Sequence, residues 1–407
     1  MNVLILTVDA GGGHRSVARA LSAGFAEVDS TCNVSTVDYL AGYAPFPLSH
    51  ARDIYTFLMR YPLLWDVFYT STNKWYSREL NAPAVGLALE AGMSRLLREY
   101  APDVIVATHP MAAPALNALL YRRRRSLPYY TVVTDYGSLH TWWAYPFGEL
   151  WFAPCPKTAR HLVRAGTPED RIVVSGYPVH PRFARREQPP GELRRALGLE
   201  PDRFTILLIG GAEGVGPLEE IVEAVAGTPA PWQLIVVTGR NYALKERLDS
   251  QAARWAIPVR VDGLVDDMPG RMHAADVLVS KAGGSTLSEA LVCGLPALLI
   301  GVLPGQEEEN ATHFQQLGVA RRMSSPAEIR VMLVELSQPG NSLLAQMRLS
   351  ACGAMPPLAS VDIARQVLSR GTAVTAPPTF PLAGLYLLQR RARRIRATMR
   401  RHNLLNW

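Results

Sequence analysis

The sequence predicts a two-domain α/β protein in which each domain holds a parallel β-sheet flanked by helices. Each half begins with an apolar run, a glycine-rich turn and a helical pattern, and strand and helix patterns then alternate along the chain. A length of 407 residues is sufficient for two such domains. Because open α/β sheets bind ligands at the carboxyl ends of their strands, two facing sheets predict a binding cleft between the domains.

Breaks in composition predict the domain boundaries. We expect a first domain over residues 1–184 and a second over residues 193–372. The linker, 185–192, contains Pro189-Pro190-Gly191. Residues 373–407 are expected to form a proline-rich hinge and a basic tail.

The composition argues against several classes of protein. The four cysteines are scattered without a Cys-x-x-Cys pair, which disfavours a disulfide framework or a zinc site and favours a reducing, cytoplasmic location. We expect neither a signal peptide nor a membrane-spanning helix, because the apolar runs are too short. Seven arginines after residue 377 account for the whole net charge of +7, and the remaining 35 basic residues balance 35 acidic ones. A nucleic-acid enzyme would instead spread basic residues along a binding face.

The first strand, Val3–Val8, leads into Gly11-Gly12-Gly13, His14 and a helix from about Arg15. The glycines allow a ligand to approach the backbone closely. A helix start lowers the pKa of a histidine, so a neutral His14 can act as a base. The alternatives are a plain strand-to-helix turn and a dinucleotide-binding turn, although the spacing does not match G-x-G-x-x-G.

An aromatic segment follows between residues 46 and 76, with nine aromatic residues in 31 positions and basic residues between them. Aromatic rings beside cations suit a membrane interface, and we expect Trp65, Phe68 and Tyr69 to lie there. An aromatic core segment or a dimer contact is the alternative interpretation.

Two further strands of the first half end at polar residues. Val104–Thr108 ends at His109, and Tyr129–Thr134 ends at Asp135, with His140 five residues later. A carboxylate and an imidazole at a strand's end are candidate acid–base groups. A single aspartate at such a place is more often a helix cap, but no clear helical pattern follows Asp135.

The most informative stretch of the second half begins with the short strand Val277–Ser280. Gly283-Gly284 follows, and a helix starts near Ser285, which predicts an anion site at the helix N-terminus. Glu289, about one turn into this helix, is placed to accept hydrogen bonds from a ribose diol. The alternative is a capping box formed by Thr286 and Glu289, which needs no ligand.

A second strand, Ala297–Ile300, leads into the polar run Pro304-Gly305-Gln306-Glu307. Its amide and carboxylate groups suit sugar hydroxyls, although an ordinary solvated turn has the same composition. Sites for an anion, a ribose and a sugar at the ends of successive strands predict a nucleotide-sugar pocket.

The tail after residue 381 predicts an amphipathic helix. Leu385, Leu388, Ala392, Ile395 and Met399 fall on one helical stripe, with arginines on the other faces. At roughly 1 kcal/mol per basic residue near an anionic leaflet, seven arginines suffice to hold a protein at a membrane. A helix packed across the two domains is the alternative.

With these residues in view, the chain resembles glycosyltransferase family 28, and most closely its diacylglycerol glycosyltransferases. The matching motifs follow one another over most of residues 1–320. They are Gly11-Gly12-Gly13-His14-Arg15-Ser16, Thr134-Asp135 with His140, Gly210-Gly211-x-Glu213-Gly214-x-Gly216-Pro217, Thr238-Gly239-Arg240-Asn241, Lys281-Ala282-Gly283-Gly284-Ser285-Thr286 with Glu289, and Pro304-Gly305-Gln306-Glu307 with Asn310.

The resemblance implies a GT-B fold, two Rossmann-like domains facing across a cleft, and a UDP-sugar donor used without a metal or other cofactor. The sequence contains no Asp-x-Asp pair, in agreement with that implication. The residues implied to contact the UDP-sugar are Gly211, Glu213, Gly214, Arg240, Gly263, Leu264, Val265, Gly283, Gly284, Ser285, Thr286, Glu289, Gln306, Glu307 and Asn310. Within this set the uracil rests on 263–265, the diphosphate on 283–286, the ribose on Glu289 and the hexose on Gln306 and Glu307.

On the acceptor side, the resemblance implies that Asp135 is the base for the acceptor hydroxyl. It also implies that His14 and His140 lie near the acceptor and the phosphate, and we add His109 to the acceptor side. Plant-type members carry a proline and a glycine where this chain has Gly284 and Ser285, which brings it nearer the bacterial branch. The arginine-rich tail is not a general feature of the family.

We therefore expect an inverting transferase that moves glucose or galactose from UDP-hexose to diacylglycerol. Its partners are the two substrates and an anionic membrane surface, and its location is the inner face of the cell membrane, as a peripheral protein. The alternatives are a transferase of the same fold with a polyprenyl-linked or other acceptor, a UDP-N-acetylglucosamine epimerase, and a membrane-binding protein without activity.

Overall fold

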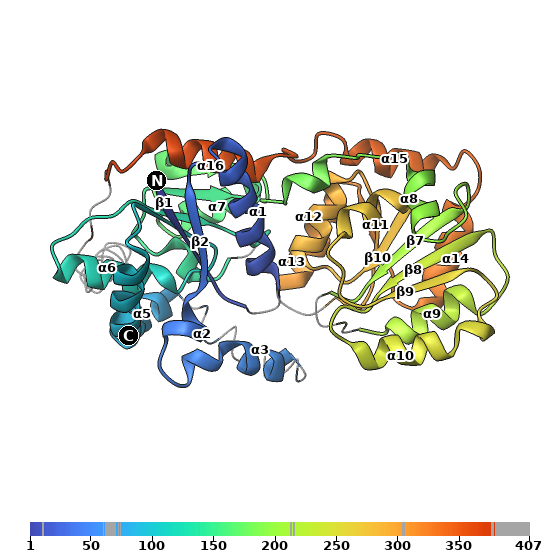
Figure 1. Cartoon of the computed structure of the whole chain (residues 1–407), viewed down its shortest axis with the longest axis horizontal. Coiled ribbons are helices and arrows are strands. Elements are labelled where there is room, and N and C mark those ends of the chain that lie inside the picture. The colour runs from blue at the N-terminus through green and yellow to red at the C-terminus, as the bar shows by residue number, and fades with distance from the viewer. Residues whose placement is uncertain are drawn as a thin grey trace, which may run out of the picture.

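Two parallel β-sheets, one in each half of the chain, form the framework of the protein (Figure 1). The computed structural model describes residues 1–9, 12–59, 61, 71, 73, 75–137, 139–211, 214, 216–302, 306–375 and 378. Within these residues each sheet has six strands, in the orders β2-β1-β3-β4-β5-β6 and β12-β11-β10-β7-β8-β9. The predicted α/β class with two parallel sheets is confirmed.

The first sheet contains β1 (Asn2–Thr7), β2 (Asn33–Asp38), β3 (Val104–Ala107), β4 (Tyr129–Val132), β5 (Leu150–Ala153) and β6 (Ile172–Val174). Its α-helices are α1 (Gly13–Val28), α2 (Tyr39–Tyr43), α3 (Ala51–Met59), α5 (Trp75–Tyr100), α6 (Ala112–Arg122) and α7 (Pro156–Arg164). Short 3-10 helices are η1 (Leu48–His50), η2 (Thr141–Ala144), η3 (Glu169–Arg171) and η4 (Pro181–Ala184).

The second sheet contains β7 (Phe204–Ile209), β8 (Trp232–Val237), β9 (Val259–Asp262), β10 (Val277–Ser280), β11 (Ala297–Leu299) and β12 (Ala320–Arg322). Its helices are α8 (Pro190–Ala196), α9 (Leu218–Ala226), α10 (Tyr242–Ser250), η5 (Ala252–Arg254), α11 (Met268–Ala274), α12 (Gly284–Val292), α13 (Gln306–Gln316), α14 (Pro326–Leu336) and α15 (Ser342–Ala351). The last described helix is α16 (Ala359–Arg370).

Alternate side chains of β1 enter two different cores. Val3 and Ile5 pack in a cluster with residues of α1 and α16, whereas Leu4 and Leu6 pack with residues of α2, α5 and α6. A parallel strand covered by helices on both faces buries every side chain, which explains why these strands appear in the sequence as unbroken apolar runs. Polar side chains therefore lie mainly after the carboxyl ends of the strands, in the loops that follow them.

The last described helix lies against the first domain. In Figure 1, α16 runs beside α1, although it follows the whole second sheet in the sequence. A Cβ atom added at Gly24 of α1 would lie 2.4 Å from the carbonyl oxygen of Ser360 in α16, so glycine permits the close packing of the two helices. Helix α8 starts at Pro190, so residues 190–192 of the predicted linker are helical.

The segment after α16 lies against the first domain at Thr375. The backbone N–H of Thr375 donates hydrogen bonds to both carboxylate oxygens of the buried Glu149, at 2.9 and 3.0 Å. The amphipathic tail helix predicted beyond it falls outside the described residues. Of the helices that the structure does describe, none has the length and apolar character to cross a bilayer.

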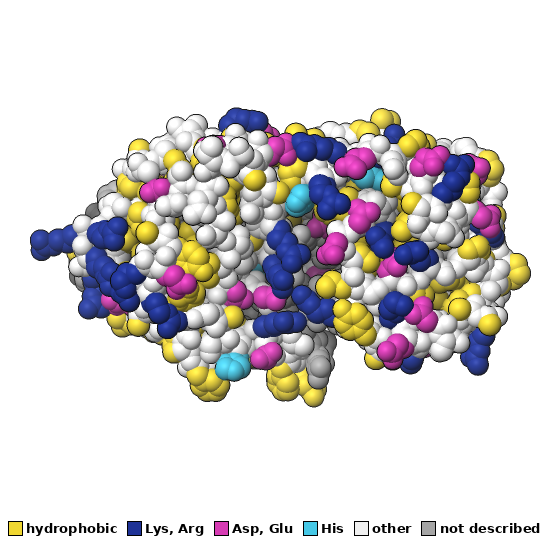
Figure 2. Space-filling model, in the orientation of Figure 1, with side chains coloured by type: hydrophobic (Ala, Val, Ile, Leu, Met, Phe, Trp, Pro, Cys, Tyr) yellow, Lys and Arg dark blue, Asp and Glu magenta, His cyan; other side chains and the backbone are white. Residues whose placement is uncertain are grey.

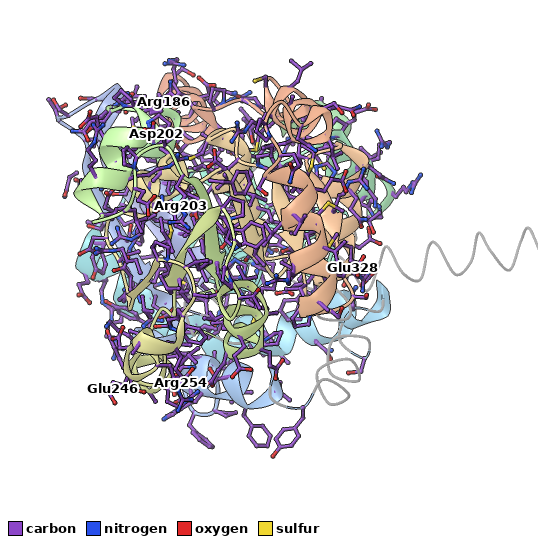
Figure 3. The ribbon with its side chains drawn as sticks, turned by 90° about the vertical axis from the view of Figure 1, so that its right-hand side faces the viewer. Arg186, Asp202, Arg203, Glu246, Arg254 and Glu328 are labelled. Carbon is purple, nitrogen blue, oxygen red and sulfur yellow. The ribbon has the colours of Figure 1, made fainter. Side chains whose placement is uncertain are left out.

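The end of the second domain that faces away from the first carries charges of both signs. Figure 3 shows Asp202, Arg203, Glu246 and Arg254 on this side, on the surface around α8 and α10. Such mixing agrees with the balanced charge that the sequence gives for the chain before the tail.

Candidate functional site

A cavity of about 630 Å³ lies between the two domains, where the carboxyl ends of both sheets meet. Figure 2 shows Lys, Arg, Asp and Glu side chains gathered around the hollow in the middle of the molecule. The cavity is lined from the first domain by residues that include Asp9, His14, Ser16, Thr134 and Asp135, and from the second by Gly210, Gly211, Leu264, Val265, Lys281, Gly283, Gly284, Ser285, Thr286, Glu289, Glu307 and Asn310. The fold thus brings residues of both halves to one site.

The N-terminus of α12 opens into this cavity. The N-cap residue is Gly283, and no side chain caps the backbone there. Thr286 therefore does not form the capping box that was the alternative interpretation. Uncapped backbone N–H groups and the positive end of the helix dipole together favour an anion.

Glu289 is a half-buried carboxyl group on the next turn of α12. Its Oε1 atom accepts hydrogen bonds from Ser16 Oγ of the first domain at 2.8 Å and from Ser285 Oγ at 3.1 Å. Burial raises the pKa of Glu289 to about 7, although both serine hydroxyls favour the charged form. A diol that reaches this carboxylate supplies hydrogen bonds that stabilise its ionised form.

An ion pair crosses the second-domain wall of the cavity. Lys281 Nζ lies 2.7 Å from Oε1 of Glu307, which is in the first turn of α13, so the polar run after β11 is helical from Gln306 onward. The side chain of Gln306 lies outside the described residues. Asn310 donates from Nδ2 to the carbonyl oxygen of Ala282 at 3.0 Å, and its buried Oδ1 atom has no partner. That oxygen remains able to accept a hydrogen bond from a ligand hydroxyl.

The glycine-rich turn after β7 is only partly described. Gly214 has a φ of 60°, and a Cβ atom there would lie 2.1 Å from the carbonyl oxygen of Thr238, so the turn requires glycine. Glu213 lies outside the described residues. Of the other residues expected on the donor side, Gly214, Arg240 and Gly263 are not among those that line the cavity.

His14 is held at the start of α1 by its Nδ1 atom. That atom lies 2.6 Å from the carbonyl oxygen of Thr108 and 3.1 Å from Oγ1 of Thr134. A carbonyl oxygen can only accept, so Nδ1 carries the proton and Nε2 keeps its lone pair. Burial lowers the pKa of His14, against a raising effect from the nearby Asp135. The neutral imidazole is therefore able to accept a proton.

Asp135 follows β4 and lies nearly buried in the wall of the same cavity. Its Oδ2 atom accepts a hydrogen bond from Nε1 of Trp143 at 2.7 Å. Thr158 Oγ1 donates to its backbone carbonyl at 3.1 Å. The indole N–H fixes the orientation of the carboxylate. The sequence did not predict this role of Trp143, because no local motif connects it to Asp135.

The other two candidate histidines, His109 and His140, are neutral and lie away from the cavity wall. His109 contacts the ring of His14, with 5.0 Å between ring centroids, and its Nδ1 lies 3.0 Å from the hydroxyl of Tyr39. Burial lowers the pKa of His109 well below its usual value, and burial lowers the pKa of His140 to about 4. His140 caps η2 by accepting from the N–H of Trp142 at 3.4 Å. Neither histidine is among the residues that line the cavity.

Helix α3 borders the cavity mouth. Arg52 and Thr56 line the cavity, whereas Phe57 of the same helix is 55% exposed, and Phe46 before the helix is 80% exposed. These two rings therefore do not belong to an aromatic core. Trp65, Phe68 and Tyr69, which were expected at a membrane, lie outside the described residues.

Comparison with known proteins gives two matches that together cover most of the chain. The family of monogalactosyldiacylglycerol synthases matches residues 14–179, and the C-terminal domain of glycosyltransferase family 28 matches residues 205–347. A probable chloroplastic monogalactosyldiacylglycerol synthase of Glycine max is 32% identical over 360 residues, which are 86% of this chain and 67% of that protein. A probable synthase 2 of Oryza sativa subsp. japonica is 32% identical over 380 residues, 90% of this chain and 80% of that one. The solved structure of MurG from Acinetobacter baumannii covers 90% of this chain and 99% of its own, with a TM-score of 0.58 at 16% identity, and shows the same GT-B fold.

Proposed function

Because the chain belongs to the monogalactosyldiacylglycerol synthase family, we propose that it transfers a hexose from a UDP-hexose to the free hydroxyl of diacylglycerol. One observation carries the chemistry of this proposal. His14 and Asp135 of the first domain line the same cavity as the uncapped N-terminus of α12 in the second. Candidate proton acceptors and an anion site thus line one cavity, as transfer from a UDP-hexose requires.

In the proposed donor complex the diphosphate lies at the start of α12. Its negative charge grows as UDP leaves, and the backbone N–H groups of residues 284–286, with the helix dipole, stabilise that charge. Lys281 supplies a full positive charge beside the same turn. Glu289 accepts from the ribose hydroxyls, and Glu307 and Asn310 from hydroxyls of the hexose. No metal ion is needed in this scheme.

On the acceptor side a base takes the proton of the diacylglycerol hydroxyl while the oxygen attacks the anomeric carbon. A single displacement on the face opposite the leaving UDP inverts the configuration at that carbon. We assign the proton to Asp135, whose carboxylate is oriented by Trp143. Nε2 of His14 is the second basic atom at the site, and its ring is fixed through Nδ1.

We further propose that the protein acts at an anionic membrane surface as a peripheral protein. Arg52 lines the cavity, the exposed ring of Phe57 lies on the same helix, and the exposed ring of Phe46 precedes that helix, which suits a site that receives a lipid from a bilayer. The seven arginines of the tail add attraction for anionic lipid.

The decisive experiment incubates the purified protein with diacylglycerol in anionic micelles and with either UDP-glucose or UDP-galactose. We measure UDP release and identify the lipid product by mass spectrometry. A glycosyl-diacylglycerol is expected, and the names of the relatives support galactose as the preferred sugar. UDP release without a lipid product would contradict diacylglycerol as the acceptor, and no turnover with either donor would contradict the transferase.

A further inference from the structure

Tyr136 directly follows Asp135 and reaches from the first domain into the second. Its ring is buried between Tyr177 and His313, with centroid distances of 5.5 and 4.7 Å and nearly parallel planes. Phe314, beside His313 in α13, contacts it edge-on at 5.1 Å. Such ring contacts hold the side chain in one orientation.

The hydroxyl of Tyr136 ends at α12. Its oxygen lies 2.7 Å from Oγ of Ser288, and that Oγ donates to the carbonyl oxygen of Gly284 at 2.6 Å. A serine hydroxyl has one proton, so the proton between Tyr136 and Ser288 comes from the tyrosine. Burial raises the pKa of Tyr136, which keeps the phenol protonated and able to donate. The chain of bonds therefore runs from the residue after Asp135 to the first residue of α12.

The same two segments also lie close to one another. A Cβ atom at Gly284 would lie 3.7 Å from the ring of Tyr136 and 3.7 Å from the carbonyl oxygen of Thr134. One position further along α12, Glu289 accepts from Ser16, which lies two residues after His14. The segments that carry His14 and Asp135 are thus each hydrogen-bonded to α12, one at Glu289 and the other at Ser288.

We propose that Tyr136 is a positioning residue that fixes the distance between the Asp135 carboxylate and the N-terminus of α12. This inference rests on the proposed function, since it assigns these two groups to the acceptor and the donor. Reaction requires the acceptor oxygen and the anomeric carbon at near-contact distance, and a small displacement of either substrate slows it strongly. The tyrosine bond thereby links the two walls of the cleft beside the reacting groups when the cleft is closed.

The test compares four proteins with the wild type: Tyr136→Phe, Ser288→Ala, the double variant, and Tyr130→Phe as the matched control. Tyr130 lies on β4, six residues before Tyr136, and its buried hydroxyl has no partner. Two readouts are recorded. One is kcat and KM for UDP-hexose, and the other is the hydrogen exchange of peptides that cover residues 133–137 and α12, which needs no substrate.

We expect Tyr136→Phe and Ser288→Ala each to lower kcat about fivefold, with KM for UDP-hexose within about twofold, because each removes the buried bond between the two hydroxyls. Tyr136→Phe also removes the weaker contact of the tyrosine hydroxyl with Sδ of Met355 at 3.6 Å, and Ser288→Ala also removes the bond to the carbonyl oxygen of Gly284. The double variant should lose about as much as either single variant, and Tyr130→Phe should keep wild-type kcat. Exchange in the first turn of α12 should rise in Tyr136→Phe alone among the two tyrosine variants.

Three outcomes would overturn the inference. One is wild-type kcat in Tyr136→Phe, and another is losses that multiply in the double variant. The third is unchanged exchange in α12, and this result counts even if the wild-type protein transfers no sugar to diacylglycerol. Absence of lipid product in the wild type together with faster exchange in Tyr136→Phe would refute the proposed function but leave the link between the domains in place.

Discussion

The two walls of the cleft use different physical means. The second-domain wall relies on a helix N-terminus and the ion pair of Lys281 with Glu307, and its groups lie close together in the sequence. The first-domain wall relies on the half-buried His14 and the buried Asp135, which come from distant parts of the chain. Recognition of an anion can thus be built locally, whereas the environment of a base requires the assembled fold.

Burial has opposite effects on the protonation of the two walls. It lowers the pKa of His14 and thereby leaves a neutral base in the first domain. In the second domain it raises the pKa of Glu289 to about 7, so this carboxyl group changes its charge near neutral pH. Changes in the first-domain wall should therefore act mainly on kcat, whereas changes in the second-domain wall should act mainly on donor binding.

The largest effect is expected for Asp135→Asn. Loss of the proton acceptor should lower kcat by about 10²- to 10⁴-fold, while KM for UDP-hexose changes little, because the donor wall is intact. Steady-state UDP release with diacylglycerol measures both constants. Trp143→Phe should lower kcat by less than Asp135→Asn, since it removes the hydrogen bond from Nε1–H to Oδ2 but keeps the carboxylate. Near-wild-type turnover in Asp135→Asn would show that Asp135 is not the base and would indicate His14 instead.

A smaller effect, on binding, is expected for Lys281→Met. Removing the cation beside the α12 turn should raise KM for UDP-hexose about tenfold, since a charge-assisted contact is lost. Lys157→Met is the matched control, because Lys157 Nζ forms an ion pair of similar length, 2.6 Å, with Glu309 of the same helix α13. Titration calorimetry with UDP compares the variants. Equal losses in both would show that general charge, not the place of Lys281, decides affinity.

The pH dependence of donor binding tests Glu289. The proposed ribose contact needs the carboxylate, so KM for UDP-hexose should rise as the pH falls below about 7 and should level off above it. The slope approaches tenfold per pH unit for a single protonation. Glu289→Gln should show a high KM that does not vary with pH. If the variant kept the wild-type pH profile, another group on the cleft would be responsible.

The smallest effect is expected from metal removal. Because α12 and Lys281 are proposed to stabilise the leaving diphosphate, EDTA should change kcat by less than about twofold. Activity is measured before and after chelation and again after addition of Mg²⁺ or Mn²⁺. Loss on chelation with recovery on addition would contradict the metal-free scheme.

The sequence was sufficient to predict the inner strands and the donor-side turn, but it did not predict the edge strands β2 and β12. Apolar runs such as Val3–Val8 predict buried strands, since both faces of a parallel sheet are covered, and β1 indeed covers Asn2–Thr7. Gly283 and the start of α12 were also foreseen, because strand, glycine and helix are adjacent in the chain. Local sequence thus gives the local geometry of the anion site.

Contacts across the cleft could not be foreseen in the same way. The bond from Ser16 to Glu289 joins residues 273 positions apart, and the bond from Tyr136 to Ser288 joins residues 152 apart. A serine or a tyrosine has many possible partners, and only the packing of the two domains selects one. For the same reason the pairing of Trp143 with Asp135 appears only in the structure.

Helix α16 has a consequence for how the cleft opens. The described part of the chain passes between the domains at residues 185–189 and again at 352–358, where it returns to α1. Two connections on one edge favour rotation about the line through both over other relative motions of the domains. Figure 1 places both connections at the edge near α16, away from α3. We therefore expect the domains to separate most widely beside α3, whose Arg52 and Thr56 line the cavity, and we expect substrates to arrive and UDP to depart on that side.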